Sequence, residues 1–467
     1  MILQQIRTGL SLFRQALLGS STINYTEGSI ARATFLLAVP MILEMAMESV
    51  FAIVDIFFVA SLGAEAVATV GLTESVISLL YAMAIGLSMG ATAMVARRIG
   101  ENSPEAAAFV AGQVLWIGVG VSVLVGLFGF LYAESILRMM GAEQSVIDMG
   151  TSYTQLMLGG CFTIVFLFLN NAIFRGAGDA SLAMRALVLA NVINIILDPC
   201  FIFGWGPFPE MGVTGAAVAT NIGRGIGLLY QFYYLFASNR RIQLVLKDFV
   251  IKLAVIMTLL RISVGGIAQF LIATASWVFL MRLVSVYGSD AVAGYTIAIR
   301  VMMFVILPAW GLSNAVATLV GQNLGAHKIE RAVSTVWQVA KYNVAYMLLV
   351  AAVLIVMPRS IMEVFTTQPQ AVAYGIDALR IMSYSFGFMG LGMVAIQAFN
   401  GAGDTVTPMW INGFCYWMVQ IPAAYWMATR LAMGPYGVFW SIFIAEILMG
   451  IVGVAFFMRG RWKYQTV

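Results

Sequence analysis

The chain has 467 residues, of which 61% are hydrophobic and only 10% are charged. Soluble domains are about half apolar and about a quarter charged, so a mean hydropathy of +0.93 leaves too few polar side chains to cover a soluble globule. This composition argues against soluble enzymes, nucleic-acid binders and disordered proteins. The modest net charge of +4 is attributed to basic residues that orient the chain in a membrane rather than to a nucleic-acid interface. The three cysteines and the single His327 lack metal-ligand spacing, so we predict neither an enzyme nor a bound cofactor.

The N-terminal segment, residues 1–33, is predicted to lie on the cytoplasmic side without a cleavable signal peptide. Apolar residues recur at helical spacing around Arg7 and Arg14, which predicts an amphipathic helix on the membrane surface. These apolar residues are Ile2, Ile6, Leu10, Phe13 and Leu17. A disordered tail is the alternative.

Twelve apolar runs follow, each close to the ~20 residues that a membrane-spanning helix needs. The first, seventh and tenth runs are long enough to tilt or bend. The runs lie near 34–60, 69–96, 108–131, 149–173, 183–204, 212–237, 255–286, 296–321, 335–357, 372–399, 406–429 and 437–458.

Basic residues in the connections predict the orientation, because cytoplasmic loops carry an excess of Lys and Arg. Only Arg138, Arg359 and Arg430 fall in the connections on one side. The opposite side collects Arg7, Arg14, Arg32, Arg97, Arg98, Arg175, Arg185, Arg240, Arg241, Lys247, Lys252, Arg261, Lys328, Arg331, Arg459, Arg461 and Lys463. Both termini should therefore be cytoplasmic, and residues 238–254 should form a cytoplasmic linker.

The two halves of the chain repeat each other at a constant offset of 225 residues. The sequence Gly-Ala-Gly-Asp occurs at 176–179 and again at 401–404. Other matches at this offset are Gly63 with Gly288, Ala66–Ala68 with Ala291–Ala293, Gly86–Ser88 with Gly311–Ser313, Gly100 with Gly325, Ile136 with Ile361, Gly150 with Gly375 and Gly212–Val213 with Gly437–Val438. Chance similarity between apolar segments would not hold register over such a distance.

The repeat predicts an all-α integral membrane protein with twelve transmembrane helices in two six-helix bundles. Six spans return the chain to its starting side, so a pseudo-two-fold axis along the membrane normal should relate the bundles. We name residues 34–237 the N-lobe and residues 255–458 the C-lobe, with 459–467 as a cytoplasmic tail. Two lobes around a central cleft are typical of an alternating-access carrier more than of a channel.

Polar residues that occur in only one half are the better candidates for function, because packing residues are shared by both halves. Asp55 aligns with Leu280 at the repeat offset. Asn194 aligns with Val419, Asp198 with Ala423, and Thr220 with Ala445. The polar set therefore belongs to the N-lobe.

The first span carries Glu44, Glu48 and Asp55 at i, i+4 and i+11, along one stripe of the helix. A carboxylate at membrane depth costs about 3 kcal/mol on insertion scales, so this stripe should face a cavity or a partner. Glu44 and Glu48 are candidates for cavity lining, the alternative being hydrated residues near the membrane interface. Pro40 removes a backbone donor, which predicts a kink there and, as a further hypothesis, a hinge.

The fifth and sixth spans supply further oxygens. Asn194 and Asp198 are one turn apart on one face, and Pro199 loosens the backbone carbonyls beside them. They form a niche for a small cation or a proton, unless they are a helix-end turn and a packing residue. In the sixth span, the Thr220 hydroxyl and the Ala216 carbonyl one turn earlier are weaker candidates, since membrane threonines usually bond their own backbone.

The eleventh span places Asn412, Tyr416 and Gln420 on one face with Trp417 beside them, as candidates to line the cleft and hold cations over aromatic rings. Other charged residues inside the runs are interpreted as structural. They are Glu74, Arg224, Arg282, Arg300, Lys341, Asp377, Arg380 and Glu446.

These motifs resemble the multidrug and toxic compound extrusion (MATE) family. The similarity rests on Pro40-Met-Ile-Leu and Ile-Val-Asp55-Ile-Phe-Phe-Val in the first span, the repeated Gly-Ala-Gly-Asp turn, and Asn194-Ile-Ile-Leu-Asp198-Pro199. It covers nearly the whole chain. The acids of the N-lobe resemble the DinF-like and archaeal-type branch in particular. Glutamates or aspartates of other branches find no counterpart in the seventh span or at 381–399, which puts a cation site in the C-lobe in doubt.

The resemblance implies a secondary antiporter that exports amphipathic, cationic drugs or metabolites in exchange for H⁺ or Na⁺. It implies a cation site of Asp55, Asn194, Asp198, Thr220 and the Ala216 carbonyl, which are metal ligands if the ion is Na⁺. We expect a monomer in a bacterial or archaeal inner membrane, with the lipid bilayer and small cationic substrates as partners and no nucleic acid. One alternative is a lipid-linked oligosaccharide flippase, which Arg282 and Arg300 would support. The other is an integral-membrane enzyme, which no motif supports.

Overall fold

The computed structural model of the chain describes residues 2–19, 23–237 and 241–467, with side chains except at 2–8 and 52. The side chains of Ile2, Ile6 and Arg7, and all of Arg240, fall outside the described residues. Helices make up almost all of the described chain. The N-terminal helix α1 (Ile2–Leu18) matches the predicted helical spacing and packs against the first span, with Ala16 buried and Leu10 and Phe13 exposed.

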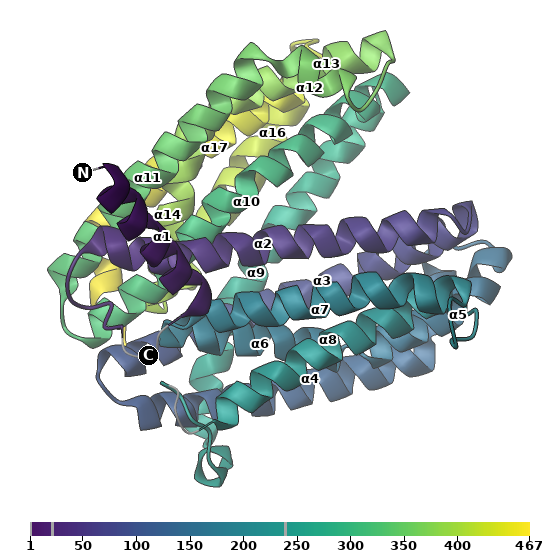
Figure 1. Cartoon of the computed structure of the whole chain (residues 1–467). Coiled ribbons are helices and arrows are strands. Elements are labelled where there is room, and N and C mark those ends of the chain that lie inside the picture. Colours follow the sequence, from purple (N-terminus) through teal and green to yellow (C-terminus); the bar gives the residue numbers. More distant parts are fainter. Residues whose placement is uncertain (1, 20–22, 238–240) are drawn as a thin grey trace.

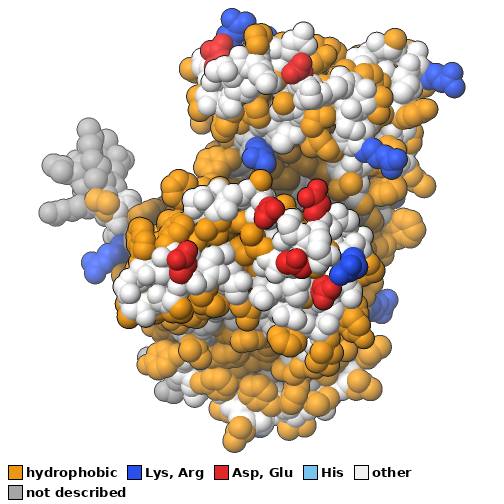
Figure 2. Space-filling view, turned by 90° about the vertical axis from the view of Figure 1, so that its right-hand side faces the viewer, with side chains coloured by type: hydrophobic (Ala, Val, Ile, Leu, Met, Phe, Trp, Pro, Cys, Tyr) orange, Lys and Arg blue, Asp and Glu red, His pale blue; other side chains and the backbone are white. Residues whose placement is uncertain are grey.

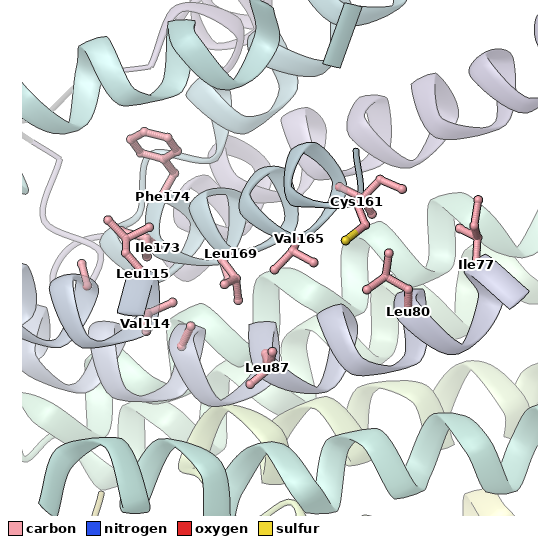
Figure 3. Close-up of a cluster of buried hydrophobic side chains, with 14 of the residues drawn as sticks. Ile77, Leu80, Leu87, Val114, Leu115, Cys161, Val165, Leu169, Ile173 and Phe174 are labelled. Atoms are coloured by element: carbon pink, nitrogen blue, oxygen red, sulfur yellow. The ribbon is translucent and has the colours of Figure 1, made fainter. Parts of the chain in front are cut away.

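The N-lobe contains the first six predicted spans. The fourth of them is divided into α5 and α6 at Gly160 and Cys161. The helices are α2 (Ile30–Ala60), α3 (Ala64–Gly100), α4 (Pro104–Met139), α5 (Gln144–Gly159), α6 (Phe162–Ala177), α7 (Ala180–Phe203) and α8 (Val213–Phe236). Buried side chains from α3, α4 and α6, among them Leu87, Val114 and Leu169, point toward one another and form the core of this lobe (Figure 3).

A short helix, η1 (Leu246–Phe249), lies in the connection to the C-lobe. The C-lobe then repeats the pattern, and its tenth span is bent by 56° between α13 and α14, in line with the predicted bend. The remaining elements are α9 (Leu253–Ser285), α10 (Ser289–Gly325), α11 (Ile329–Val356), α12 (Pro358–Glu363), α13 (Pro369–Ser383), α14 (Phe386–Ala402), α15 (Val406–Asn412), the π-helix η2 (Gly413–Gln420), α16 (Ile421–Tyr425), the π-helix η3 (Trp426–Arg430), α17 (Pro435–Arg459) and η4 (Arg461–Tyr464).

By length and composition, eight helices of the described chain could each cross a membrane, and the bent pair α13–α14 makes a ninth. The segments α2, α8 and α15–η3 occupy the other three predicted spans. The helix α2 (Figure 1) is unbroken from Ile30 to Ala60 with Pro40 inside it, so the proline does not end the helix, and the predicted kink stays a prediction.

Contacts between the lobes confirm the predicted repeat. A Cβ atom on Gly86 would meet Ile267, and one on Gly311 would meet Ile42, which are the same contact displaced by the repeat offset. Likewise Gly100 lies against the backbone of Gln322, while Gly325 lies against the backbone of Arg97. These reciprocal contacts are those expected when a pseudo-two-fold axis passes between α3 and α10.

The two lobes converge at the end that carries both termini and diverge at the opposite end (Figure 1). We call these the closed end and the open end. At the closed end Lys328 Nζ, just before α11, and Arg331 Nη1 of α11 donate to the carbonyls of Thr26 and Gly28, at 3.1 and 2.9 Å respectively. The Arg98 guanidinium of α3 donates to the Val467 carbonyl at 3.0 Å. Each terminal segment thus ties one lobe to the other, at the end where most basic residues gather.

Close packing at the closed end gives a first prediction. In Gly100→Ala the new Cβ would lie 2.0 Å from the Gln322 carbonyl oxygen, so the lobes would have to separate there. We expect roughly 1–3 kcal/mol of destabilisation, measured as a lower melting temperature of the purified protein. The matched control is Gly120→Ala, since no atom beyond the local helix backbone lies within 4 Å of a Cβ at that helical position. Equal melting temperatures for both variants would contradict the tight contact.

Candidate functional site

The polar residues predicted on the fifth and sixth spans lie together in the N-lobe. The Asn194 side chain on α7 donates from Nδ2 to Asp198 Oδ1 at 3.0 Å, one turn along the same helix. The same Nδ2 donates to Thr220 Oγ1 of α8 at 3.4 Å. Close packing of α7 against α8 brings them together, because Gly223 leaves no Cβ between α8 and the backbone of Asn194. Asn194, Asp198 and Thr220 are all buried, as is Ala216 one turn before Thr220.

Asp55 of α2 joins this group from the facing helix. The residue is 6% exposed, and its carboxyl lies within hydrogen-bonding reach of Thr220 and within electrostatic range of Asp198. The structure therefore brings together Asp55, Asn194, Asp198 and Thr220, which are four of the five predicted ligands, with Ala216 adjacent to them.

Several buried oxygens of this site have no hydrogen-bond donor. Oδ1 of Asp55, Oδ1 of Asn194 and Oδ2 of Asp198 each lack a partner. Buried polar atoms are nearly always paired, so these oxygens are suited to a small cation or to a proton on a carboxylate. In the described part of the chain, no three His, Cys, Asp or Glu side chains gather into a site for a more highly charged metal.

An arginine that we interpreted as structural proves to be part of the surroundings of this site. Arg224 lies one turn after Thr220 on α8, is 8% exposed, and donates from Nη2 to the Tyr81 hydroxyl at 2.9 Å. Its guanidinium carbon lies 4.6 Å from the centre of the Phe51 ring on α2. Glu48, Asp55 and Glu74 interact electrostatically with this guanidinium, which offsets part of their negative charge.

Glu44 lies in a second polar group nearer the closed end. It is 2% exposed, and its Oε1 accepts from Asn171 Nδ2 at 2.8 Å and lies 3.6 Å from Arg175. Gln231 of α8 in turn donates to Asn171 Oδ1 at 2.6 Å. Glu48, one turn further along α2, is only partly buried. The cavity-lining role of both glutamates stays a prediction.

The eleventh span places three of its four candidates inside the C-lobe. Asn412, Tyr416 and Gln420 are at most 7% exposed, and Ser276 donates to Gln420 Oε1 at 2.8 Å. Trp417 is 46% exposed, with its indole N–H donating to the Ile272 carbonyl at 3.0 Å. The C-lobe counterparts of the cation site are apolar, as Leu280, Val419, Ala423 and Ala445 show.

Figure 2 looks onto the open end, where the two lobes form separate masses with a hollow between them that hydrophobic side chains line. Acidic side chains gather on the lower mass, the N-lobe, whereas basic side chains are more frequent on the C-lobe. The exposed acids in the helix ends and connections of the N-lobe at this end are Glu65, Glu134, Glu143, Asp148 and Glu210.

The chain is similar to known proteins over almost its whole length. A family model described as MatE matches residues 40–200 and 265–426, which are most of both lobes. The probable multidrug resistance protein NorM of Thermotoga maritima is 28% identical over 435 residues, 92% of this chain and 93% of that protein.

Two of the solved structures that resemble the chain are described as MATE in the straight and in the bent conformation. The straight form gives a TM-score of 0.88 at 29% identity, covering 94% of this chain and 98% of that one. The bent form gives a TM-score of 0.87 at 29% identity, covering 93% and 96%.

Proposed function

The chain belongs to the MatE family of multidrug and toxic compound extrusion transporters, and from this premise we propose that it is a secondary antiporter. It exports amphipathic, cationic compounds by alternating access in exchange for H⁺ or Na⁺. The observation that carries the proposal is the group of unpaired oxygens on Asp55, Asn194 and Asp198, which is buried at membrane depth in one lobe. Such oxygens favour reversible occupancy by a monovalent cation or a proton.

The shape of the molecule supports alternating access. The lobes are separated at the open end and tied together at the closed end by Gly100, Gly325 and both terminal segments. If the basic closed end is cytoplasmic, as the distribution of Lys and Arg predicts, this state faces outward. The location of this multi-pass protein in a bacterial or archaeal inner membrane, with both termini cytoplasmic, is part of the proposal.

The cationic nature of the cargo is supported by charge. Acidic side chains around the N-lobe mouth raise the local concentration of cations there. The relative from Thermotoga maritima is named for multidrug resistance, in keeping with a cargo class defined by shape and charge. These features favour antiport over the flippase alternative, for which Arg282 and Arg300 are the candidate groups.

Transport by the purified protein in liposomes tests the proposal. We expect a fluorescent cation such as ethidium to move against its own gradient when an opposing H⁺ or Na⁺ gradient is imposed. The two ions are supplied in separate experiments, so that the driving ion is identified. Asp55→Asn in matched liposomes is the control for leakage. Equilibration of ethidium without accumulation, under both gradients, would contradict antiport.

A further inference from the structure

A single carboxylate is buried in the middle of the C-lobe, away from the acids of the N-lobe. Glu446 lies near the centre of α17 and is 8% exposed. The Tyr416 hydroxyl donates to its Oε1 at 3.2 Å. Throughout the described chain, no basic side chain forms an ion pair with Glu446.

The helical segment that carries Tyr416 has an unusual backbone geometry. Tyr416 lies in the π-helix η2, which ends two residues before Pro422. A proline has no N–H to donate to the carbonyl four residues earlier, so the wider π turn accommodates the missing bond. One turn before Tyr416, Asn412 is 7% exposed and its Oδ1 has no donor. This stretch therefore presents a hydroxyl and an unsatisfied amide oxygen inside the lobe.

The repeat places Glu446 at the depth of the cation site in the other lobe. Its neighbour Ala445 is the counterpart of Thr220, which contacts Asn194 in the N-lobe. The C-lobe lacks the other ligands, because Val419 and Ala423 stand where the N-lobe has Asn194 and Asp198. The two lobes thus carry carboxylates at similar depth but in different surroundings.

An isolated carboxylate at this depth is costly unless a proton or a cation neutralises it. Among the described side chains, Tyr416 is the one that hydrogen-bonds Glu446, and on η2 and α15 the one unsatisfied buried side-chain oxygen is that of Asn412. The carboxylate therefore has few ligands to share with a small inorganic ion. An organic ammonium suits it better, since Tyr416 supplies an aromatic ring and Met449, in the same apolar cluster, adds a methionine side chain on the same face of α17.

We propose that Glu446 is a cargo anchor, which binds the cationic group of the exported compound from the C-lobe side. The anchor rests on the proposed export of cationic amphiphiles and adds to it a residue of the second lobe. Because Glu446 and Asp55 lie in different lobes, cargo and coupling ion need not share ligands. The anchor accounts for a buried acid that the coupling site does not use.

Equilibrium binding to the purified protein, without any ion gradient, tests the anchor. Glu446→Gln preserves shape and removes the charge, so the Kd for the cation rhodamine 6G should rise roughly tenfold or more. The Kd for the neutral dye Nile red should stay within about twofold of wild type. Glu446→Asp, which keeps the charge, should retain preference for the cation and serves if the glutamine variant folds poorly.

Two matched controls separate charge from packing. Glu363→Gln removes an exposed acid of the same lobe, and it should leave both Kd values unchanged. Tyr416→Phe removes the hydroxyl but keeps the carboxylate, so rhodamine 6G should still bind better than Nile red. An unchanged rhodamine 6G Kd in Glu446→Gln, or equal weakening of both dyes, would overturn the anchor alone. Failure of wild type to bind rhodamine 6G would overturn the cationic cargo class as well.

Discussion

Asp55→Asn should abolish gradient-driven efflux while leaving a folded, membrane-inserted protein. The substitution keeps the size of the side chain but removes the charge whose occupancy has to change through the transport cycle. We expect the transport rate to fall about a hundredfold or more. No other residue within one helical turn of Asp55 on α2 carries a carboxylate that could replace it. Drug resistance of cells that express the variant at wild-type level should drop to that of cells without the transporter.

Asp198→Asn should have the same outcome, because the Asp198 carboxylate completes the group around Asn194. Glu65→Gln is the matched control, since this acid is exposed in the first turn of α3. Wild-type resistance in either aspartate variant, at matched expression, would remove that residue from the coupling site. Loss of resistance in the control would show that general surface charge is responsible.

Pro40→Ala should strongly reduce transport while cargo and ion binding survive. Pro40 is buried within α2, fifteen residues or about four turns before Asp55. The proline leaves a gap in the helix hydrogen bonds, so straight and bent forms of α2 differ by only about a few kcal/mol. Occupancy of Asp55 changes its need for solvation and shifts this balance. Alanine restores the missing bond and locks one form.

Distances between spin labels measure this effect. Labels at Ala60 and Glu134, two exposed positions near the open end of α2 and α4, should show a distance change with pH or Na⁺ in wild type. The change should be absent in Pro40→Ala and present in Pro308→Ala, the matched control on α10 of the C-lobe. Equal changes in wild type and Pro40→Ala would leave Pro40 without a hinge role.

The repeat and the twelve spans were predictable from the sequence, because apolar runs and a constant offset can be recognised without knowing how the helices pack. The Gly-Ala-Gly-Asp turns illustrate why. Gly178 and Gly403 both end a helix with positive φ, at 85° and 88°, so the same sequence forms the same turn in each lobe. Comparing the two halves singled out Asp55, Asn194, Asp198 and Thr220, and the resemblance to the family implied that they share one cation site.

The partners of the other polar residues were not predictable in this way. Glu44 accepts a hydrogen bond from Asn171 and forms an ion pair with Arg175, both on α6. These contacts depend on the packing of helices that are distant in the sequence. The comparison of halves nevertheless contained a signal, since Asn171 aligns with Ile396 and Arg224 with Met449. The proposed role of Glu446 was not predicted from the sequence, because it depends on the hydrogen bond with Tyr416, a residue of the π-helix η2.

The central claim is that coupling resides in the N-lobe site alone. Ion release on cargo binding tests it most directly, measured with purified protein in weak buffer as H⁺ or Na⁺ released per rhodamine 6G bound. We expect release from wild type, none from Asp55→Asn, and an unchanged ratio from Leu280→Asp, which places an acid at the C-lobe counterpart of Asp55. Undiminished release from Asp55→Asn, or a doubled ratio in Leu280→Asp, would contradict the account.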